Sequence, residues 1–131
     1  VLVWDGVTGE LRDRRSAADL CVCAIAVSPD GRTVAVATGW PGWDRAGEPA
    51  PSASLRTFLA PGGPLRRPLA SDPKGGDPFL ALAFHPGGGV LAATSLRRPG
   101  TVFAFDVEET KALWESRTGD RFVGLATTAD G

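Results

Sequence analysis

Residues 24–38 read Ala-Ile-Ala-Val-Ser-Pro-Asp-Gly-Arg-Thr-Val-Ala-Val-Ala-Thr, which is two alternating apolar runs joined by a Ser-Pro-Asp-Gly turn. Pro29 fixes φ near the value that a turn needs, Asp30 can bond its own backbone, and Gly31 accepts a positive φ. The flanking residues alternate with a period of two, which a strand satisfies and a helix does not. The stretch therefore predicts a β-hairpin.

This hairpin recurs along the chain. Residues 81–95 read Ala-Leu-Ala-Phe-His-Pro-Gly-Gly-Gly-Val-Leu-Ala-Ala-Thr-Ser, and residues 124–131 read Gly-Leu-Ala-Thr-Thr-Ala-Asp-Gly. The copies start at Ala24, Ala81 and Gly124, with spacings of 57 and 43 residues. The long segment between Gly39 and Ala53, rich in proline and glycine, accounts for the larger first spacing and is predicted to be an inserted loop.

A second kind of hairpin alternates with the first. An aromatic residue marks it at Trp4, Phe58 and Phe105, with spacings of 54 and 47 residues. The repeating unit is therefore a meander of four strands, here called a, b, c and d in chain order. Such a unit at this period is typical of one blade of a β-propeller, in which blades pack face to face around a channel. The predicted fold class is all-β, a propeller segment of four-stranded antiparallel blades.

Residues 24–38 together with Val-Leu-Val-Trp-Asp-Gly-Val-Thr-Gly-Glu-Leu at 1–11 resemble the a–b hairpin and the c–d turn of WD40 repeats. Trp4-Asp5 matches the Trp-Asp dipeptide of that family, Phe105-Asp106 is a variant of it, and Phe58-Leu59 lacks the acid. The Gly-His pair that the family carries between strand d and the next strand a is absent. The resemblance implies a propeller that acts as an interaction scaffold.

The blades can be assigned along the sequence. We expect residues 1–14 to be strands c and d of one blade, 21–69 a second blade, 79–116 a third, and 122–131 the first strand of a fourth. Within the second blade, 65–69 is the predicted strand d and 70–78 a loop. Propellers close with about 4 to 8 blades, so the predicted ring is incomplete. We expect a part of a larger protein, whose isolated chain self-associates or needs the remaining blades.

Composition limits the classes of partner. The 131 residues include 14 basic and 15 acidic side chains, for a net charge of −1. This balance gives no field that would attract nucleic acid or an anionic membrane, so neither is a predicted partner. No apolar run approaches the roughly 18 residues of a membrane span. The compartment is not fixed by these features, and a cytoplasmic location is favoured.

Signals for catalysis, metals and cofactors are weak, and none is predicted. Cys21 and Cys23 are the only cysteines and would pack on one strand face as small apolar residues. Their Cys-X-Cys spacing lacks a second half of a metal site, because His85 is the only histidine and lies in a predicted turn. No nucleophile elbow, phosphate-binding loop or zinc-protease motif is present.

Loop lengths separate the two edges of the predicted blades. All a–b and c–d turns are short and fall on one edge, whereas the b–c and d–a connections fall on the other and include the long loops. Binding residues concentrate on loops held by a rigid scaffold, and tryptophan and arginine dominate interface hot spots. The candidate partner-binding residues on the long-loop edge are Trp40, Trp43, Asp44, Arg45, Lys74, Arg97 and Arg98.

Two functions from different classes follow. The favoured one is a non-enzymatic scaffold that binds a protein or peptide through the long-loop edge. The alternative is a segment of a propeller enzyme, such as a hydrolase, a lactonase or a quinoprotein-like dehydrogenase, because similar hairpins occur in those propellers. An enzyme should place polar residues at the channel-facing start of strand a. Cys21, Cys23, Phe79 and Phe122 are mostly apolar, which favours the scaffold.

Overall fold

Antiparallel strands make up the regular structure. The computed structural model describes residues 1–16, 21–39, 53–72, 78–120 and 124–128. Within these ranges it contains ten strands: β1 (Leu2–Trp4), β2 (Leu11–Arg14), β3 (Cys21–Val27), β4 (Thr33–Gly39), β5 (Ala53–Leu59), β6 (Ala70–Asp72), β7 (Phe79–Phe84), β8 (Val90–Ser95), β9 (Thr101–Asp106) and β10 (Lys111–Arg117). The described residues include no helix long and apolar enough to cross a membrane.

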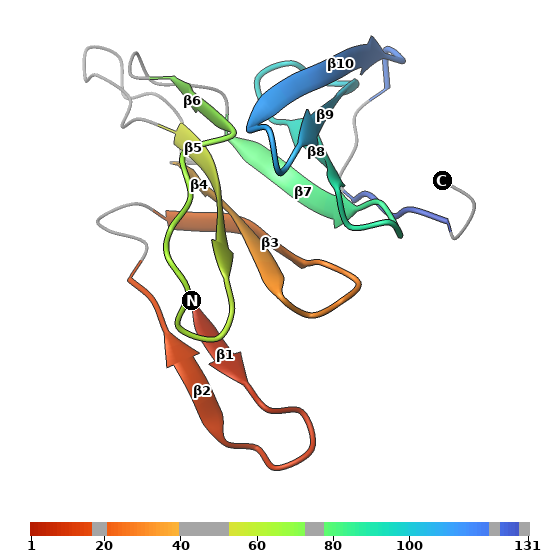
Figure 1. Cartoon of the computed structure of the whole chain (residues 1–131). Coiled ribbons are helices and arrows are strands. Elements are labelled where there is room, and N and C mark those ends of the chain that lie inside the picture. The colour runs from red at the N-terminus through yellow and green to blue at the C-terminus, as the bar shows by residue number, and fades with distance from the viewer. Residues whose placement is uncertain (17–20, 40–52, 73–77, 121–123, 129–131) are drawn as a thin grey trace, which may run out of the picture.

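The strands form three separate sheets. The order is β1-β2 in a two-stranded sheet, β3-β4-β5-β6 in one four-stranded sheet, and β7-β8-β9-β10 in the other. Each four-stranded sheet is a simple meander, because every strand pairs with its sequence neighbour. The two meanders stack face to face, with β7 lying against β3 and β4 (Figure 1). The predicted all-β propeller segment of four-stranded blades is thereby confirmed.

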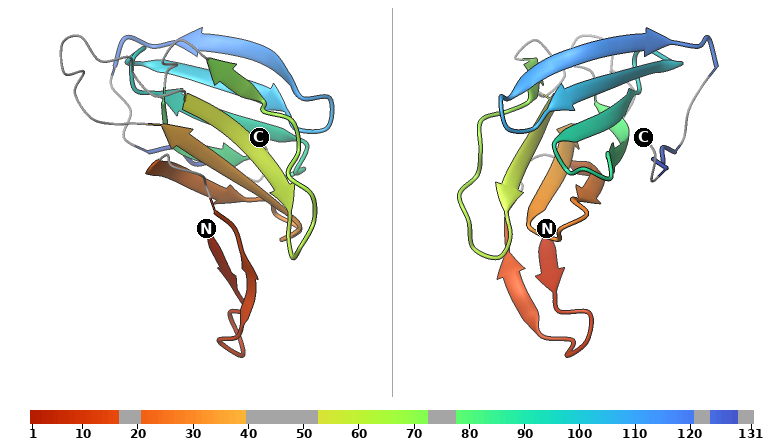
Figure 2. Two further views of the ribbon diagram at one scale, coloured as in Figure 1. Left: turned by 90° about the vertical axis from the view of Figure 1, so that its left-hand side faces the viewer. Right: turned by 45° about the vertical axis from the view of Figure 1, so that its right-hand side comes forward.

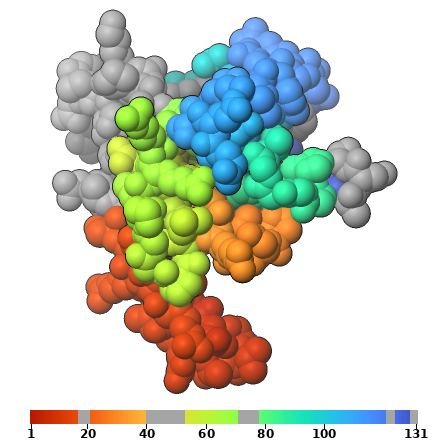
Figure 3. Space-filling view, in the orientation of Figure 1, coloured from red at the N-terminus to blue at the C-terminus, as the bar shows by residue number. Residues whose placement is uncertain are grey.

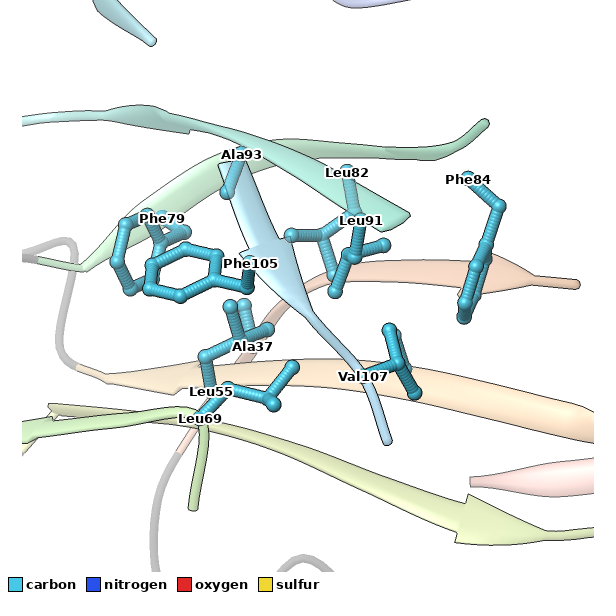
Figure 4. Packing of buried hydrophobic residues seen from close by; sticks show 11 residues of the cluster. Ala37, Leu55, Leu69, Phe79, Leu82, Phe84, Leu91, Ala93, Phe105 and Val107 are labelled. Carbon is cyan, nitrogen blue, oxygen red and sulfur yellow. The ribbon is translucent and has the colours of Figure 1, made fainter. Parts of the chain in front are cut away.

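The main hydrophobic cluster lies between the two four-stranded sheets. One side comes from β4 and β5 and includes Ala37 and Leu55, and the other comes from β7 to β9 and includes Leu91 and Phe105 (Figure 4). The ring of Phe79 meets those of Phe103 and Phe105 edge to face, at centroid distances of 5.9 Å each. Burial of these side chains fixes how one sheet sits on the next.

A smaller cluster joins the β1-β2 hairpin to the opposite face of the β3–β6 sheet. Val34, Val36 and Phe58 form it, and Val1 packs against them. Strand β4 is therefore buried on both faces, with its odd and even residues in different clusters. The hairpin itself projects beyond the larger sheets (Figures 2 and 3).

The acids of the two Trp-Asp-like dipeptides shape equivalent turns. One carboxylate oxygen of Asp5 accepts the backbone N–H groups of Val7 and Thr8, each at 2.9 Å. One carboxylate oxygen of Asp106 accepts the backbone N–H groups of Glu108 and Glu109, at 2.9 and 2.8 Å. Both turns then pass through a positive φ, at Gly9 (73°) and at Thr110 (54°). The resemblance to WD40 repeats thus has a local physical basis in each turn.

The last strand of the β3–β6 sheet does not lie where the sequence predicts it. Residues 65–69 lie alongside β5 through one isolated bridge, between Leu65 and Phe58, and through the N–H groups of Arg66 and Leu69, which donate to the carbonyl oxygens of Thr57 and Leu55 at 2.8 Å each. They form no regular ladder, which is made instead by β6 with the start of β5. Pro64 and Pro68 lack the N–H that a ladder needs, and Leu59 replaces the acid that organises the other turns. The strand prediction for 65–69 and the loop prediction for 70–72 are therefore wrong.

The strand predicted in 122–131 is also absent from its described part, because residues 124–128 are not in a strand. This segment nevertheless lies beside β7, since the hydroxyl of Thr127 donates to the carbonyl oxygen of Phe84 at 2.7 Å. Residues 121–123 and 129–131 lie outside the described residues.

The two cysteines do not share a buried face. The pairing of β3 with β4 shifts register between Val22 and Ala24, which places a bulge at Cys23. Cys21 is exposed and Cys23 is half-buried, and both thiols are free. Burial, and in second place the neighbouring Cys21, raise the pKa of the Cys23 thiol. The prediction that both pack in the core is wrong for Cys21.

Candidate functional site

The roots of the long connections come together at one edge of the two stacked sheets. We call this the loop edge and define it by Gly39, Ala53, Pro78 and residues 96–100. A Cβ placed on Gly39 would lie 2.9 Å from the Cβ of Pro78 and 3.3 Å from that of Ala53. The backbone N–H of Leu96 donates to the carbonyl oxygen of Pro78 at 3.0 Å. The segments that enter and leave 40–52, 73–77 and 96–100 are therefore neighbours.

Arg98 is held on this edge by hydrogen bonds and by an aromatic ring. Its backbone N–H donates to the hydroxyl of Ser95 at 2.8 Å, and its guanidinium donates to Glu115 at 3.3 Å. The same guanidinium lies over the ring of Phe103, with 4.8 Å between its carbon and the ring centroid. Its side chain is still 46% exposed. Such a cation–π contact restricts the arginine without removing it from solvent.

The sequence gives a partial signal for this arrangement. Glu115 and Phe103 are directly paired residues of β10 and β9, so their side chains share one face of the sheet. Neither residue is among those predicted from the sequence to line the site. The register of β9 with β10 depends on a bulge between Ala112 and Trp114, which alternation alone does not locate.

The structure describes two of the predicted partner-binding residues. Arg97 and Arg98 are exposed in the connection between β8 and β9, on the loop edge as predicted. The others lie outside the described residues: Trp40, Trp43, Asp44, Arg45 and Lys74. For those five, the assignment to partner binding stays a prediction.

The opposite edge carries the short turns. Ser28, Pro29, Asp30 and Gly31 close the β3-β4 hairpin, and the carboxylate of Asp30 accepts the hydroxyl of Ser28. The hydrogen bond from the Ser28 hydroxyl is the largest cause that lowers the pKa of Asp30, and the bond from the backbone N–H of Arg32 is the second. His85 begins the equivalent turn of the other sheet, and its Nδ1 accepts the N–H of Gly87 at 3.0 Å. These polar groups hold the turns in shape.

The residues at the start of strand a do not distinguish an enzyme from a scaffold, because they do not line a channel as the sequence suggested. Phe79 is buried between the sheets, against Phe103 and Phe105, and so does not face a channel. Cys21 faces solvent, and Phe122 lies outside the described residues. Across the described ranges, no three His, Cys, Asp or Glu side chains gather in a way that could hold a metal ion.

Comparisons with known proteins agree with this architecture. No profile of a protein family matches the chain. No curated protein matches it. A solved structure of hydrazine synthase from Kuenenia stuttgartiensis is similar, with a TM-score of 0.62 and 21% identity over 94% of this chain and 31% of that one.

Two further solved structures are the WD40 repeats of RRP9 and the protein U3-55K. Each has a TM-score of 0.58 and 18% identity, over 85% of this chain and 30% or 31% of the other. The chain therefore spans about a third of the length of the structures it matches. At these identities the likeness concerns the fold, which is that of a WD40-like β-propeller segment.

Proposed function

We propose that this chain is a non-enzymatic scaffold that binds a protein or peptide through the loop edge. The observation that carries the proposal is the convergence of connections from two sheets at Gly39, Pro78 and Leu96. Loops that leave a rigid framework side by side form one continuous surface, and such surfaces commonly carry recognition. WD40-like neighbours of this fold support the same class of function.

The residue types on this surface suit protein recognition. Arg98 is already restricted by Phe103 and Glu115, so little side-chain freedom would be lost when a partner binds. Arginine and tryptophan are the residues most enriched at hot spots. We assign Trp40, Trp43 and Arg97 to the same surface because their connections start or end at the loop edge.

The test is affinity capture followed by binding measurements with the identified partner. We expect Trp40→Ala combined with Trp43→Ala, and separately Arg97→Ala, to weaken binding at least tenfold, as truncation of hot-spot residues costs about 2 kcal/mol or more. Arg32→Ala, which removes an exposed arginine from the opposite edge, is the matched control and should bind as the wild type does.

Circular dichroism of each variant shows whether the sheets are intact. The proposal fails if the loop-edge variants retain all partners at unchanged affinity, or if Arg32→Ala alone abolishes binding. Turnover of a small-molecule substrate by the purified chain would favour the enzyme alternative instead.

A further inference from the structure

Strand β10 leaves one of its two sides unpaired. It stands at the end of the order β10-β9-β8-β7, and β9 is its one strand neighbour within the described ranges. Residues 124–128 lie at the other end of this order, because Thr127 bonds to Phe84 of β7. In both views of Figure 2, β10 is the outermost strand of its sheet. Further blades of a propeller pack on the faces of a blade, so this open side of β10 does not depend on how many blades the ring has.

The open side of β10 is longer than those of the other outer strands that the structure describes. Strand β2 has four residues, and β6 has three and follows Pro68 by two positions. Short strands and prolines commonly protect a sheet edge from pairing with another chain. Strand β10 has seven residues, all of them exposed and none of them proline. It therefore lacks both kinds of protection.

The backbone N–H and C=O groups of Glu115 and Arg117 face this open side. The N–H of Thr118 donates to the carbonyl oxygen of Gly100, directly before β9, at 2.9 Å. Successive residues of an antiparallel strand direct these groups to alternate sides. Ser116 therefore bonds toward β9, as Thr118 does, and the groups of Glu115 and Arg117 point away from the sheet.

The side chains of the same two residues carry opposite charges and lie on one face. Glu115 and Arg117 are paired with Phe103 and Thr101 of β9. Contacts within the chain hold both side chains close to the strand. Arg98 donates to the carboxylate of Glu115 and Arg117 donates to the hydroxyl of Thr101, at 3.3 Å each. Side chains that are already restricted lose less freedom when a partner binds.

A second, antiparallel copy of β10 matches this pattern in a register centred on Ser116. Glu115 of each copy then lies opposite Arg117 of the other copy. Both pairs are of the kind in which two residues exchange both N–H···O bonds, because the backbone groups of both residues point outward. Directly opposite residues have their side chains on the same face, so each carboxylate meets a guanidinium.

The neighbouring registers place like charges together. A register centred on Glu115 puts the two carboxylates opposite each other, and one centred on Arg117 does the same with the two guanidinium groups. Like charges directly opposite destabilise a pair of strands, whereas opposite charges stabilise it. The charges of β10 therefore favour pairing with a second copy of itself in the register centred on Ser116.

We propose that two copies of this chain form a symmetric dimer through the open sides of their β10 strands, antiparallel and centred on Ser116. The two β7–β10 sheets join edge to edge into one continuous sheet. The same residues contribute on both sides, which is the property of an isologous interface around a two-fold axis. The dimer uses no blade face, and it does not rest on the partner binding proposed for the loop edge.

Charge reversal tests the pairing of the two residues. Glu115→Arg alone places arginine opposite arginine in both pairs, and Arg117→Glu alone places glutamate opposite glutamate. A mixture of the two variants restores opposite charges, because one copy then carries two arginines and the other two glutamates. Glu108→Arg and Arg67→Glu make the same changes at exposed residues outside β10 and are the matched controls.

Sedimentation velocity over a wide range of concentration measures the Kd of each dimer, and circular dichroism shows whether the sheets are intact. We expect the wild type and both controls to reach twice the monomer mass of 13.6 kDa. Each reversal alone should raise the Kd at least tenfold, and an equimolar mixture should return it to near the wild-type value. A wild type that stays monomeric throughout, or a mixture that binds no tighter than the single variants, would overturn the proposal.

Ser116→Cys tests the register. The two copies of residue 116 form a pair without backbone hydrogen bonds, whose Cα atoms lie about 4.5 Å apart, and a disulfide spans about 4.4 to 6.8 Å. In a background of Cys21→Ser and Cys23→Ser, oxidised glutathione should link two copies through one disulfide and be released as two reduced molecules. Thr118→Cys in that background is the control and should not be linked, because its counterpart in the dimer is Trp114. Absence of the link in Ser116→Cys, or equal linking in Thr118→Cys, would overturn the register.

Discussion

The guanidinium of Arg15 lies over the ring of Phe58, with 5.3 Å between its carbon and the ring centroid. The same side chain donates to the carbonyl oxygen of Gly63 at 2.7 Å and to the carboxylate of Asp13 at 3.0 Å. Asp13 in turn accepts the N–H of Gly62, which is the first cause of its lowered pKa. Arg15 thus connects the β1-β2 hairpin to the β3–β6 sheet.

The first prediction concerns this connection. Arg15→Ala should loosen the hairpin, because it removes a cation–π contact of about 0.5 to 1 kcal/mol together with a charged hydrogen bond. Hydrogen exchange of the amides of β1 and β2 should accelerate, while that of β7–β10 stays unchanged. Arg14→Ala, which removes an exposed arginine next to it, is the control. Equal protection in both variants would show that Arg15 does not hold the hairpin.

The second prediction concerns the Asp5 turn. The N–H of Thr8, the side chain of Arg12 and the N–H of Val7, in that order, lower the pKa of Asp5 from 3.8 to about 2. A carboxylate with a lowered folded pKa stabilises the fold at a pH above its unfolded pKa, and this stabilisation is lost as pH falls through the folded value. The hairpin should therefore lose stability between about pH 4 and pH 2.

Two-dimensional NMR of the Asp5 carboxyl during an acid titration measures this directly. We expect a midpoint near 2, with the amide signals of Val7 and Thr8 shifting along with it. Asp5→Asn retains the acceptor oxygen and should remove this pH dependence, whereas Glu10→Gln, at the other carboxylate near Arg12, should not. A midpoint near the ordinary value of 3.8 would contradict the turn geometry.

The third prediction concerns the core between the sheets. Leu91 is fully buried there, so Leu91→Ala should lower the free energy of unfolding by about 2 to 5 kcal/mol through lost burial and a cavity. Leu65→Ala makes the same chemical change at an exposed site and should cost far less. Urea unfolding of both variants measures the difference. Similar losses would mean that Leu91 is not central to the packing.

The fourth prediction concerns the close approach at the loop edge. A methyl group on Gly39 would meet the Cβ atoms of Pro78 and Ala53 at 2.9 and 3.3 Å, so Gly39→Ala should force the strands apart. We expect a loss of about 1 to 3 kcal/mol, as is usual for overpacking. Gly89→Ala, where an added Cβ meets nothing within 4 Å, is the control. Thermal unfolding that is unchanged in Gly39→Ala would argue against the convergence of the connections.

The fold was predictable where turn chemistry and alternation agree. Residues within the turn fix its shape in the Ser-Pro-Asp-Gly hairpin and in the Asp5 and Asp106 turns. The strands around these turns lie close to their predicted bounds. The predicted strand position was wrong where two strands pair although the turn between them lacks such residues. Pro64 and Pro68 interrupt the return strand, so residues 65–69 make scattered hydrogen bonds to β5 and a regular ladder begins only at β6.

A period-two pattern cannot locate a bulge, and it cannot tell what covers each face of a strand. The register shift at Cys23 breaks the alternation between Cys21 and Ile25, and a period-two pattern does not signal it. Alternation likewise does not tell that Trp4 and Ile25 are exposed, whereas Phe58 and Leu82 at equivalent positions are buried. At the candidate site, the sequence placed Arg97 and Arg98 on the loop edge but not the contact of Arg98 with Phe103.

Two separate meanders that stack through their faces define this fold, and NOE spectroscopy of methyl-labelled protein measures the stacking directly. The methyl groups of Ala37 and Leu55 should show NOEs to those of Leu91, across the cluster between the sheets. No backbone NOEs of paired strands should link β3–β6 with β7–β10. Backbone NOEs that join β6 or β3 to a strand of the other sheet in one ladder, without the methyl contacts, would show one continuous sheet in place of two stacked ones.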